Sequence, residues 1–381
     1  MIRGMSDAIE EHFGSGLRSP SATDGTARRE NGEGDGAGEG GARLLVLRGA
    51  GGKAFCAGGD VKAVAEAQSL GAGVAGTLRS DFFRDEYRLD YRLASIARQQ
   101  QALLSLWDGV VMGGGVGISI HGTFRVVTET VLFAMPETVI GMLPDVGAAH
   151  VLSRLPGGLG QYLGLTGARL KGDDLLYCGL ATHLVPRDRL PDLEEALLAD
   201  DGHDPASVLG RFVSGLTQPG ASMLAKNKRW IDEAFAGSRS VENIVRKLEA
   251  RASGAPGDQC GNRSSELSAN DDDKDSSGRE WARETLSSLA KASPTALKWR
   301  FLQVAHRHIA WASTTSLKDC FERDFRVVQH IMGHQDFGEG VRALLVDKDN
   351  RPVWVPPTLE GVSESAVEAF FAPIGDEELE I

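Results

Sequence analysis

The sequence feature that most restricts the fold is a repeated order of buried strand, glycine-rich turn and helix. Residues 43–48 (RLLVLR) are a short apolar run that stops at Gly49, and a helical stretch follows the next glycines. A second apolar run leads in the same way into the glycines of 113–117 and a helix of small residues. Strands that alternate with helices predict an α/β chain. The expected strands are residues 43–48, 102–106, 124–128 and 131–134, and the expected helices start near Val61 and cover 81–97.

Composition divides the rest of the chain. Residues 18–41 are rich in Gly, Ser, Glu and Ala, and residues 253–279 are rich in Ser, Asp, Asn and Gly. Neither segment has enough apolar surface to offset the entropy of ordering, so both are predicted to be disordered, the second as an acidic insertion. The remaining expectations are a helix within 1–17, an α/β core at 42–252, and a helical C-terminal region at 280–381, with helices at 294–312 and 314–332 and an irregular tail at 336–357.

Charge and cysteine content argue against several classes of protein. The formal net charge of −12 is opposite to the basic face that nucleic-acid-binding proteins usually have. No apolar run approaches the roughly 20 residues that a membrane-spanning helix requires. The four cysteines are scattered without a CxxC pair, which predicts reduced thiols and neither disulfides nor a metal site. The N-terminal residues show neither a secretory signal nor an Arg-rich transit peptide, so no targeting signal is visible.

Three short segments carry chemistry: AFCAGGD at 54–60, MGGGVG at 112–117, and MPETVIG at 135–141, followed by PDVG at 144–147. One glycine-rich turn alone is usually a packing solution. Two such turns can each present an unhindered backbone N–H, and two such donors make an oxyanion hole. Glu137 follows a proline that stiffens its turn, and it is a candidate base or nucleophile. Together the segments predict chemistry at an acyl carbonyl.

The order FCAGGD, MGGGVG and FAMPETxIG resembles the enoyl-CoA hydratase/isomerase (crotonase) superfamily. The resemblance implies a spiral of β-β-α units that binds acyl-CoA and polarises the thioester carbonyl with two backbone amides. Matched position by position, these are the amides of Gly59 and Gly114. The residues matched to CoA binding are Ala54, Phe55 and Ala57, whose backbone would lie against the adenine end, and Lys53 and Lys62, as candidate phosphate partners.

The pattern at residue 117 separates the branches of this superfamily. Enoyl-CoA hydratases typically carry a glutamate two residues after the triple glycine and use it with a second glutamate to handle water. In this chain the first position is Gly117, while the second glutamate matches Glu137. Asp145 stands where hydratases usually have glycine. The pattern PETxIGxxPDVG, together with the C-terminal segment 336–356, resembles the 3-hydroxyisobutyryl-CoA hydrolases, and this resemblance places Glu86 near the acyl pocket.

The activity implied by the resemblance is hydrolysis of the thioester of 3-hydroxyisobutyryl-CoA, or of a similar short 3-hydroxyacyl-CoA, in valine catabolism. Glu137 would activate water or attack the carbonyl itself, and Asp145 would hold the 3-hydroxyl of the substrate. The alternatives are a hydratase or isomerase of the same fold and a non-catalytic acyl-CoA-binding protein. No metal or redox cofactor is implied, since CoA is part of the substrate. The resemblance also implies that the protein could assemble as a homo-oligomer. If the source is a eukaryote, it implies the mitochondrial matrix as the location, with the cytoplasm as the alternative.

The N-terminus departs from the family pattern. The family normally opens with strands and an Asn-Arg-Pro signature before its first helix, whereas residues 1–10 resemble that helix itself. We therefore expect the opening N-terminal strands to be missing, as they would be from an incomplete gene model. Their absence would leave the edge of the sheet beside residues 43–48 uncovered.

Overall fold

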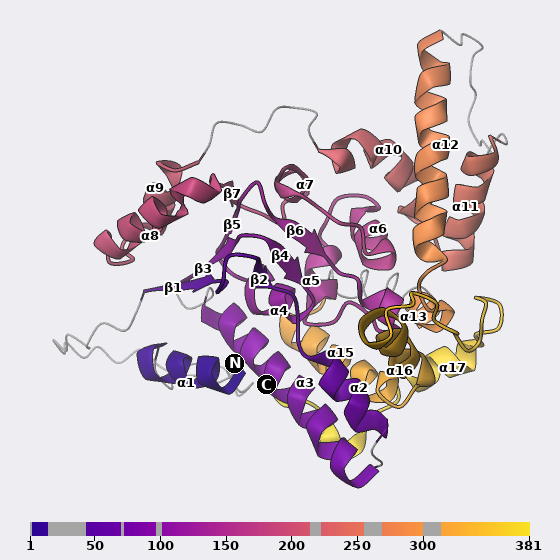
Figure 1. The fold of residues 1–381 in the computed structure, drawn as a ribbon, viewed down its shortest axis with the longest axis horizontal. Helices are drawn as coiled ribbons and strands as arrows, with labels where there is room; N and C mark the ends of the chain where they lie inside the picture. Colours follow the sequence, from indigo (N-terminus) through magenta and orange to yellow (C-terminus); the bar gives the residue numbers. More distant parts are fainter. Residues whose placement is uncertain are drawn as a thin grey trace, which may run out of the picture.

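Two parallel β-sheets form the centre of the computed structural model (Figure 1). The strand order is β1-β3-β5-β7 in the larger sheet and β2-β4-β6 in the smaller one. The structure describes residues 2–13, 43–69, 72–96, 101–213, 222–254, 269–299 and 314–381. The strands are β1 (Leu44–Arg48), β2 (Ala54–Cys56), β3 (Ala102–Trp107), β4 (Val110–Met112), β5 (Phe124–Val127), β6 (Leu132–Ala134) and β7 (His183–Leu184).

Successive turns of the chain build both sheets at once. Strands β1, β3 and β5 enter the larger sheet, and the strand that follows each of them enters the smaller sheet. Neighbours pair in parallel, with Leu44 opposite Ala102 and Leu104 opposite Phe124 in the larger sheet. Parallel pairs need crossover connections, which helices supply here. The first crossover contains α2 (Val61–Ser69) and α3 (Ala72–Ile96), and the second contains α4 (Gly114–Ile120). The predicted spiral of β-β-α units is therefore confirmed.

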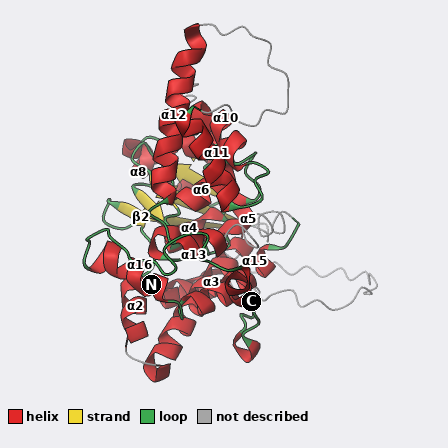
Figure 2. Cartoon of the chain, turned by 90° about the vertical axis from the view of Figure 1, so that its right-hand side faces the viewer, coloured by secondary structure: helices red, strands yellow, loops and turns green. Residues whose placement is uncertain are grey.

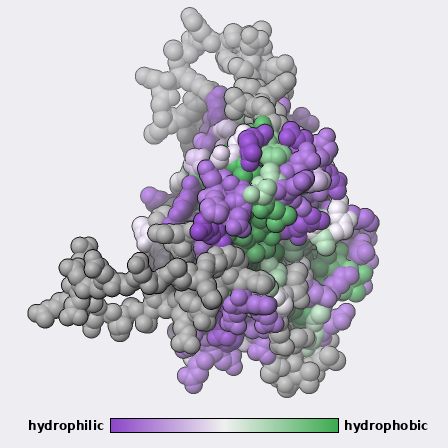
Figure 3. All heavy atoms as spheres, turned by 90° about the vertical axis from the view of Figure 1, so that its left-hand side faces the viewer, coloured by the Kyte–Doolittle hydropathy of each residue, from purple (hydrophilic) through white to green (hydrophobic). Residues whose placement is uncertain are grey.

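The central strands are buried on both faces, as is typical of parallel sheets covered by helices. Leu103, Leu104 and Trp107 of β3 have 0% of their surface exposed. Leu104 belongs with Val126 to a smaller apolar cluster that also contains residues of α8 (Leu190–Ala199) and α9 (Pro205–Gly210). Figure 3 shows the side of the molecule on which α8 and α9 lie, where a strip of apolar side chains runs between polar ones.

The other helices surround the sheets, and the strands lie inside them in Figure 2. Among the helices that the structure describes, none is long and apolar enough to cross a membrane. A helix is present at the N-terminus, where Arg92 of α3 donates to the carbonyl oxygen of Ser6 at 3.4 Å. These helices are α1 (Ile2–Phe13), α5 (Ala148–Leu152), α6 (Leu159–Thr166), α7 (Gly172–Tyr177), α10 (Met223–Phe235), α11 (Val241–Ser253), α12 (Ala269–Leu289), α13 (Pro294–Trp299), α15 (Leu317–Ile331), α16 (Gln335–Val341) and α17 (Glu364–Ala369), with 3-10 turns η1 (Glu137–Ile140), η2 (Arg187–Arg189) and η5 (Gly375–Glu377).

The prediction of a disordered insertion at 253–279 is wrong for its last part. Residues 269–279 belong to α12, which packs along α11 (Figure 2). Trp281 anchors the helix, because its ring lies 6.0 Å from that of Trp230 and 6.1 Å from that of Tyr162. Extending a helix costs far less than starting one, so an anchored helix continues through residues that would not fold alone. Residues 18–41, 255–268 and 300–313, on which other predictions fall, lie outside the described residues.

The prediction of an irregular tail at 336–357 is wrong for its first half. Helix α16 covers Gln335–Val341 and continues as a π-helical turn, η4 (Arg342–Val346). Phe337 and Val341 are one helical turn apart and are 0% and 1% exposed, so burial of this face offsets the weak helix propensity of the two glycines in the segment. The helix predicted at 314–332 is present as α15, Leu317–Ile331.

Helix α16 lies directly against the turn η1, which begins with Glu137. A β-carbon on Gly340 would lie 2.5–2.7 Å from main-chain atoms of Ile140, and one on Gly141 would lie 2.6 Å from the main chain of Asp336. The two backbones can therefore touch only because both positions are glycine. Asp336 is fully buried and accepts hydrogen bonds from Ser293 Oγ at 2.6 Å and Val355 N at 3.0 Å, which ties α16 to its neighbours.

The substitution Gly340→Ala should destabilise the protein by about 1–3 kcal/mol, because the new methyl group cannot fit against Ile140 without a backbone shift. Gly210→Ala is the matched control, since a β-carbon at this position in α9 meets no atom within 4 Å. The free energy of unfolding from urea denaturation measures both. Equal stability of the two variants would show that the contact between α16 and η1 is not tight.

Candidate active site

The amides of Gly59 and Gly114 come together at the ends of two neighbouring strands. A β-carbon on Gly114 would lie 3.6 Å from Gly59 N, and one on Gly58 would lie 3.6 Å from Gly114 N. Gly58 and Gly113, which precede the two amides, have φ of +104° and +53°, conformations that favour glycine. Within the described part of the chain, neither N–H donates to a backbone carbonyl. The site therefore offers two adjacent donors, which is what an oxyanion hole requires.

Glu137 lies beside these amides on the turn η1. Its Oε1 is 3.7 Å from the position of a β-carbon on Gly113, and its side chain is only 5% exposed. Pro136 precedes the turn, and Gly141 ends it in a left-handed conformation. The main-chain oxygen of Glu137 accepts from Met142 N at 2.9 Å, which fixes the backbone that carries the carboxylate. The Pro-stiffened turn predicted from sequence thus holds an acid beside the two amides.

Asp145 lies on the following loop and is bound by a tyrosine. Tyr87 of α3 donates its hydroxyl to Asp145 Oδ2 at 2.5 Å, and the two side chains are 0% and 4% exposed. The pKa of Asp145 is raised to about 7: burial raises it most, the Tyr87 hydrogen bond lowers it, and the charge of Asp324 raises it. Burial also raises the pKa of Tyr87 well above its usual range, so the phenol remains a donor. Asp145 therefore titrates close to neutral pH.

The backbone next to Asp145 is strained. Val146 has φ of +52°, a left-handed conformation that costs a β-branched residue on the order of 1–3 kcal/mol. Three hydrogen bonds hold the loop in place: His121 Nε2 to Val146 O at 3.1 Å, Gly147 N to Asp324 Oδ2 at 2.9 Å, and Ala148 N to Asp145 O at 2.8 Å. His121 thus makes a structural contact with this loop.

Two acids on one face of α3 cover two glycines of α4. A β-carbon on Gly114 would collide with Glu86 Oε1, and one on Gly117 would collide with Asp90 Oδ2. Glu86 and Asp90 are 7% and 0% exposed. Burial, followed by the charge of Asp145, raises the pKa of Glu86 to about 8. Glu86 is therefore mostly neutral at pH 7, beside the predicted oxyanion hole.

The residues matched to CoA binding lie on both sides of Gly59, at positions 53–57 before it and at Lys62 after it. Ala54 and Phe55 lie in β2, with Phe55 buried in the core, while Ala57, Lys53 and Lys62 are exposed. Lys62 also lines a surface hollow of about 350 Å³ between α2 and the segment formed by α16 and η4. The structure thus brings both lysines to the surface on either side of the glycine turn.

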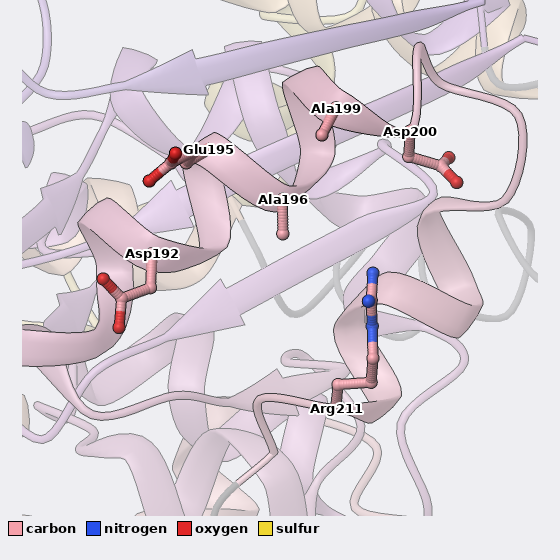
Figure 4. A pocket seen from close by; sticks show the side chains of 6 residues that line it. All are labelled: Asp192, Glu195, Ala196, Ala199, Asp200 and Arg211. Atoms are coloured by element: carbon pink, nitrogen blue, oxygen red, sulfur yellow. The ribbon is translucent and has the colours of Figure 1, made fainter.

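Another hollow, of about 530 Å³, lies between α8 and α9 (Figure 4). It is lined by Asp192, Glu195, Ala196, Ala199, Asp200 and Arg211. None of the predicted site residues is among them. Among the described residues, no group of three or more His, Cys, Asp or Glu side chains is arranged to hold a metal ion.

Sequence reasoning missed Tyr87, Asp90 and Asp324. Tyr87 lies in sequence on the mostly apolar face of its helix, and this pattern gives no sign of a polar contact. Asp90 follows Glu86 by one helical turn, and this spacing was the available signal that both acids share a face. Asp324 is almost 180 residues from the loop that it holds, and no local sequence pattern predicts that contact.

Glu86→Gln should reduce the pH dependence of stability. The pKa of Glu86 rises from 4.5 to about 8 in the folded protein, so folding retains a proton that the unfolded chain releases. This contribution is fully present below pH 4.5 and is lost as pH rises to about 8. The melting temperature of the wild type should therefore fall more between pH 5 and 8 than that of E86Q. The exposed Asp81→Asn on the same helix is the control, and parallel curves for E86Q and wild type would contradict the prediction.

The comparisons with known proteins agree with this geometry. The enoyl-CoA hydratase/isomerase family model matches residues 37–371. The mitochondrial 3-hydroxyisobutyryl-CoA hydrolase of Gallus gallus is 40% identical over 344 residues, which are 89% of this chain and 79% of that protein. The probable 3-hydroxyisobutyryl-CoA hydrolase 3 of Arabidopsis thaliana is 40% identical over 88% of this chain and 81% of its own length.

Solved structures agree at the level of the fold. A carnitinyl-CoA dehydratase from Mycobacterium thermoresistibile superposes with a TM-score of 0.71 at 36% identity, covering 89% of this chain and 85% of that one. An enoyl-CoA hydratase from Rhodobacter sphaeroides gives a TM-score of 0.71 at 32% identity, covering 89% and 86%. The chain therefore belongs to the enoyl-CoA hydratase/isomerase (crotonase) family and, within it, to the 3-hydroxyisobutyryl-CoA hydrolases.

Proposed function

We propose that this protein hydrolyses the thioester of 3-hydroxyisobutyryl-CoA to free CoA and 3-hydroxyisobutyrate, a step of valine catabolism. The observation that carries the proposal is that the buried acids Glu137 and Asp145 stand near two adjacent, available amides, in a chain 40% identical to proteins of that name. We extend to this chain the mitochondrial location in the names of its animal relatives, and the matrix is the compartment proposed. Assembly as a homo-oligomer remains a prediction.

The oxyanion hole supports attack at the thioester carbonyl. When the carbonyl carbon becomes tetrahedral, its oxygen takes a negative charge, which the adjacent N–H groups of Gly59 and Gly114 would receive together. Removing one such donor typically costs on the order of 100- to 1,000-fold in rate. A neutral Glu86 next to Gly114 puts no opposing charge there, which favours the same step.

Glu137 is the proposed catalytic acid–base or nucleophile. In one route it takes a proton from water, the water oxygen attacks the carbonyl carbon, and the C–S bond breaks as the thiolate regains a proton. In the other route its carboxylate attacks directly, CoA leaves, and water hydrolyses the anhydride. The buried carboxylate at the Gly113–Gly114 turn supports either route.

Asp145 is proposed to hold the 3-hydroxyl of the substrate and to influence the charge of Glu137. Tyr87 favours the ionised form of Asp145, and a carboxylate accepts a hydrogen bond from a hydroxyl group. Neighbouring carboxyl groups push their pKa values apart, so an ionised Asp145 resists a second charge nearby.

The proposed contacts of the CoA moiety are Ala54, Phe55, Ala57, Lys53 and Lys62. No metal or separate cofactor enters the proposal.

The hydratase alternative is disfavoured at residue 117. A glutamate side chain has no room there, since a β-carbon on Gly117 would collide with Asp90 and would lie 2.7 Å from Val146 Cβ. The pair of glutamates with which hydratases typically bind and activate water is therefore incomplete, since only Glu137 is present.

Glu137→Gln should lower the rate of CoA release by at least about 100-fold while acyl-CoA still binds, because the amide can neither accept the proton nor attack. Free thiol released from 3-hydroxyisobutyryl-CoA measures the rate, with crotonyl-CoA hydration assayed on the same preparation. Near-normal thiol release by E137Q would remove Glu137 from the mechanism. Hydration without thiol release by the wild type would favour the hydratase instead.

Tyr87→Phe should shift the acid limb of the pH–rate profile upward by about one pH unit. Loss of a hydrogen bond to a charged group is worth about 1.5 kcal/mol, which corresponds to about one pKa unit. The pKa of Asp145 would then exceed its value of about 7, so less of it is ionised at neutral pH. kcat/KM measured from pH 5 to 9 should fall about five-fold at pH 7 and recover at higher pH. A uniform fall at every pH would indicate lost packing instead.

A further inference from the structure

Asp90 is a buried acid that the mechanism above does not use. It is 0% exposed, and within the described part of the chain neither of its carboxyl oxygens has a hydrogen-bond partner. Leaving a buried carboxyl group without a partner destabilises a fold, and the large majority of buried polar side chains are hydrogen-bonded. Such a group in a native protein calls for an explanation, such as an ordered water, a bound ligand or a role in function.

The position of Asp90 connects it to the candidate active site on two sides. Its Oδ2 lies over Gly117, the residue of α4 one turn after the oxyanion-hole glycine. The side chain of Val146, the residue after Asp145, lies over the same glycine, 2.7 Å from the place of a β-carbon. Asp90 also shares its face of α3 with Glu86, whose carboxyl group lies over Gly114. The unpartnered carboxyl group thus belongs to the cluster of Glu86 and Asp145.

The surroundings of Asp90 favour its neutral form. Burial raises its pKa well above the usual range, and the neighbouring acidic groups Glu86, Asp145 and Cys56 raise it further. A neutral carboxylic acid donates through its O–H and accepts through its other oxygen. A hydroxyl group also donates and accepts, whereas a carboxylate would be repelled by the neighbouring acids.

We propose that Asp90 is a specificity-determining residue of the acyl site, and that its carboxyl group hydrogen-bonds the hydroxyl substituent of the acyl chain together with Asp145. The inference rests on the proposed thioesterase function. In this arrangement the hydroxyl donates to the ionised Asp145 and accepts from Asp90. Gly117 is required because any side chain there would displace the Asp90 carboxyl group.

The test compares two thioesters that differ only in this hydroxyl group, 3-hydroxyisobutyryl-CoA and isobutyryl-CoA. The measured quantity is the ratio of their kcat/KM values for CoA release. The substitution Asp90→Leu keeps a similar shape but removes the polar atoms, and it should lower the ratio by about 10-fold, the cost of leaving the buried substrate hydroxyl without its donor. Asp90→Asn keeps a donor and an acceptor and should retain the ratio within about three-fold.

Stability supplies a second readout that does not depend on turnover. Because Asp90 has no partner in the described residues, D90L should melt at or above the temperature of the wild type. Asp174→Leu is the matched control: Asp174 is also buried, but it accepts from Ser222 Oγ at 2.8 Å and Leu224 N at 2.9 Å, so D174L should melt lower.

An unchanged ratio in D90L, or equal losses on both thioesters, would overturn the proposal, as would a melting temperature of D90L that falls as far as that of D174L. Wild-type CoA release from 3-hydroxyisobutyryl-CoA tests the proposed function itself. The two proposals can therefore be tested separately. CoA release by the wild type tests the activity, and the kcat/KM ratio and the melting temperature of D90L test the role of Asp90.

Discussion

The close approach of α3 to α4 determines the arrangement of the whole site. Helix α4 presents backbone at Gly114 and Gly117, and the carboxyl groups of Glu86 and Asp90 fill the space that side chains would otherwise take. The residue between them on α3, Tyr87, reaches Asp145. One helix thus supplies both the acids above the proposed oxyanion hole and the donor that holds the next loop. A shift of α3 by the width of a methyl group would disturb all three contacts.

Electrostatics accounts for the remaining arrangement. Glu86, Asp90, Glu137 and Asp145 are all at most 7% exposed, and full ionisation of such a cluster would cost a great deal in a medium of low polarity. The protein distributes the charge by unequal hydrogen bonding. Asp145 accepts a hydrogen bond from the Tyr87 hydroxyl. Of Asp145, Glu86 and Asp90, it therefore ionises most readily, while the other two retain their protons. The strained backbone at Val146 and the buried acids both lower the stability of the fold, as is common at functional sites.

Much of this fold could be predicted because its signals are local. Glycine turns after buried strands mark β1, β3 and α4, and the motif order indicates which amides and acids meet. The first part of α12, residues 269–279, was missed because Trp281, which anchors the helix, lies beyond this polar segment. Helix α16 was missed because its stability comes from burial of Phe337 against distant residues. Asp324 and the conformation of Val146 belong to the same class, since only tertiary contact determines them.

The order in which the site is completed follows from where its supports lie in the chain. The turn that carries Glu137 rests on α16, and the loop that carries Asp145 is held by Asp324 of α15. Both supports are made nearly 200 residues after the groups they hold. A nascent chain therefore possesses every proposed catalytic group long before it can hold them in place. A chain that ended after α13 would contain every motif but would lack α15 and α16, which hold the site in place. The presence of the motifs alone therefore does not show that a shortened transcript encodes an active protein.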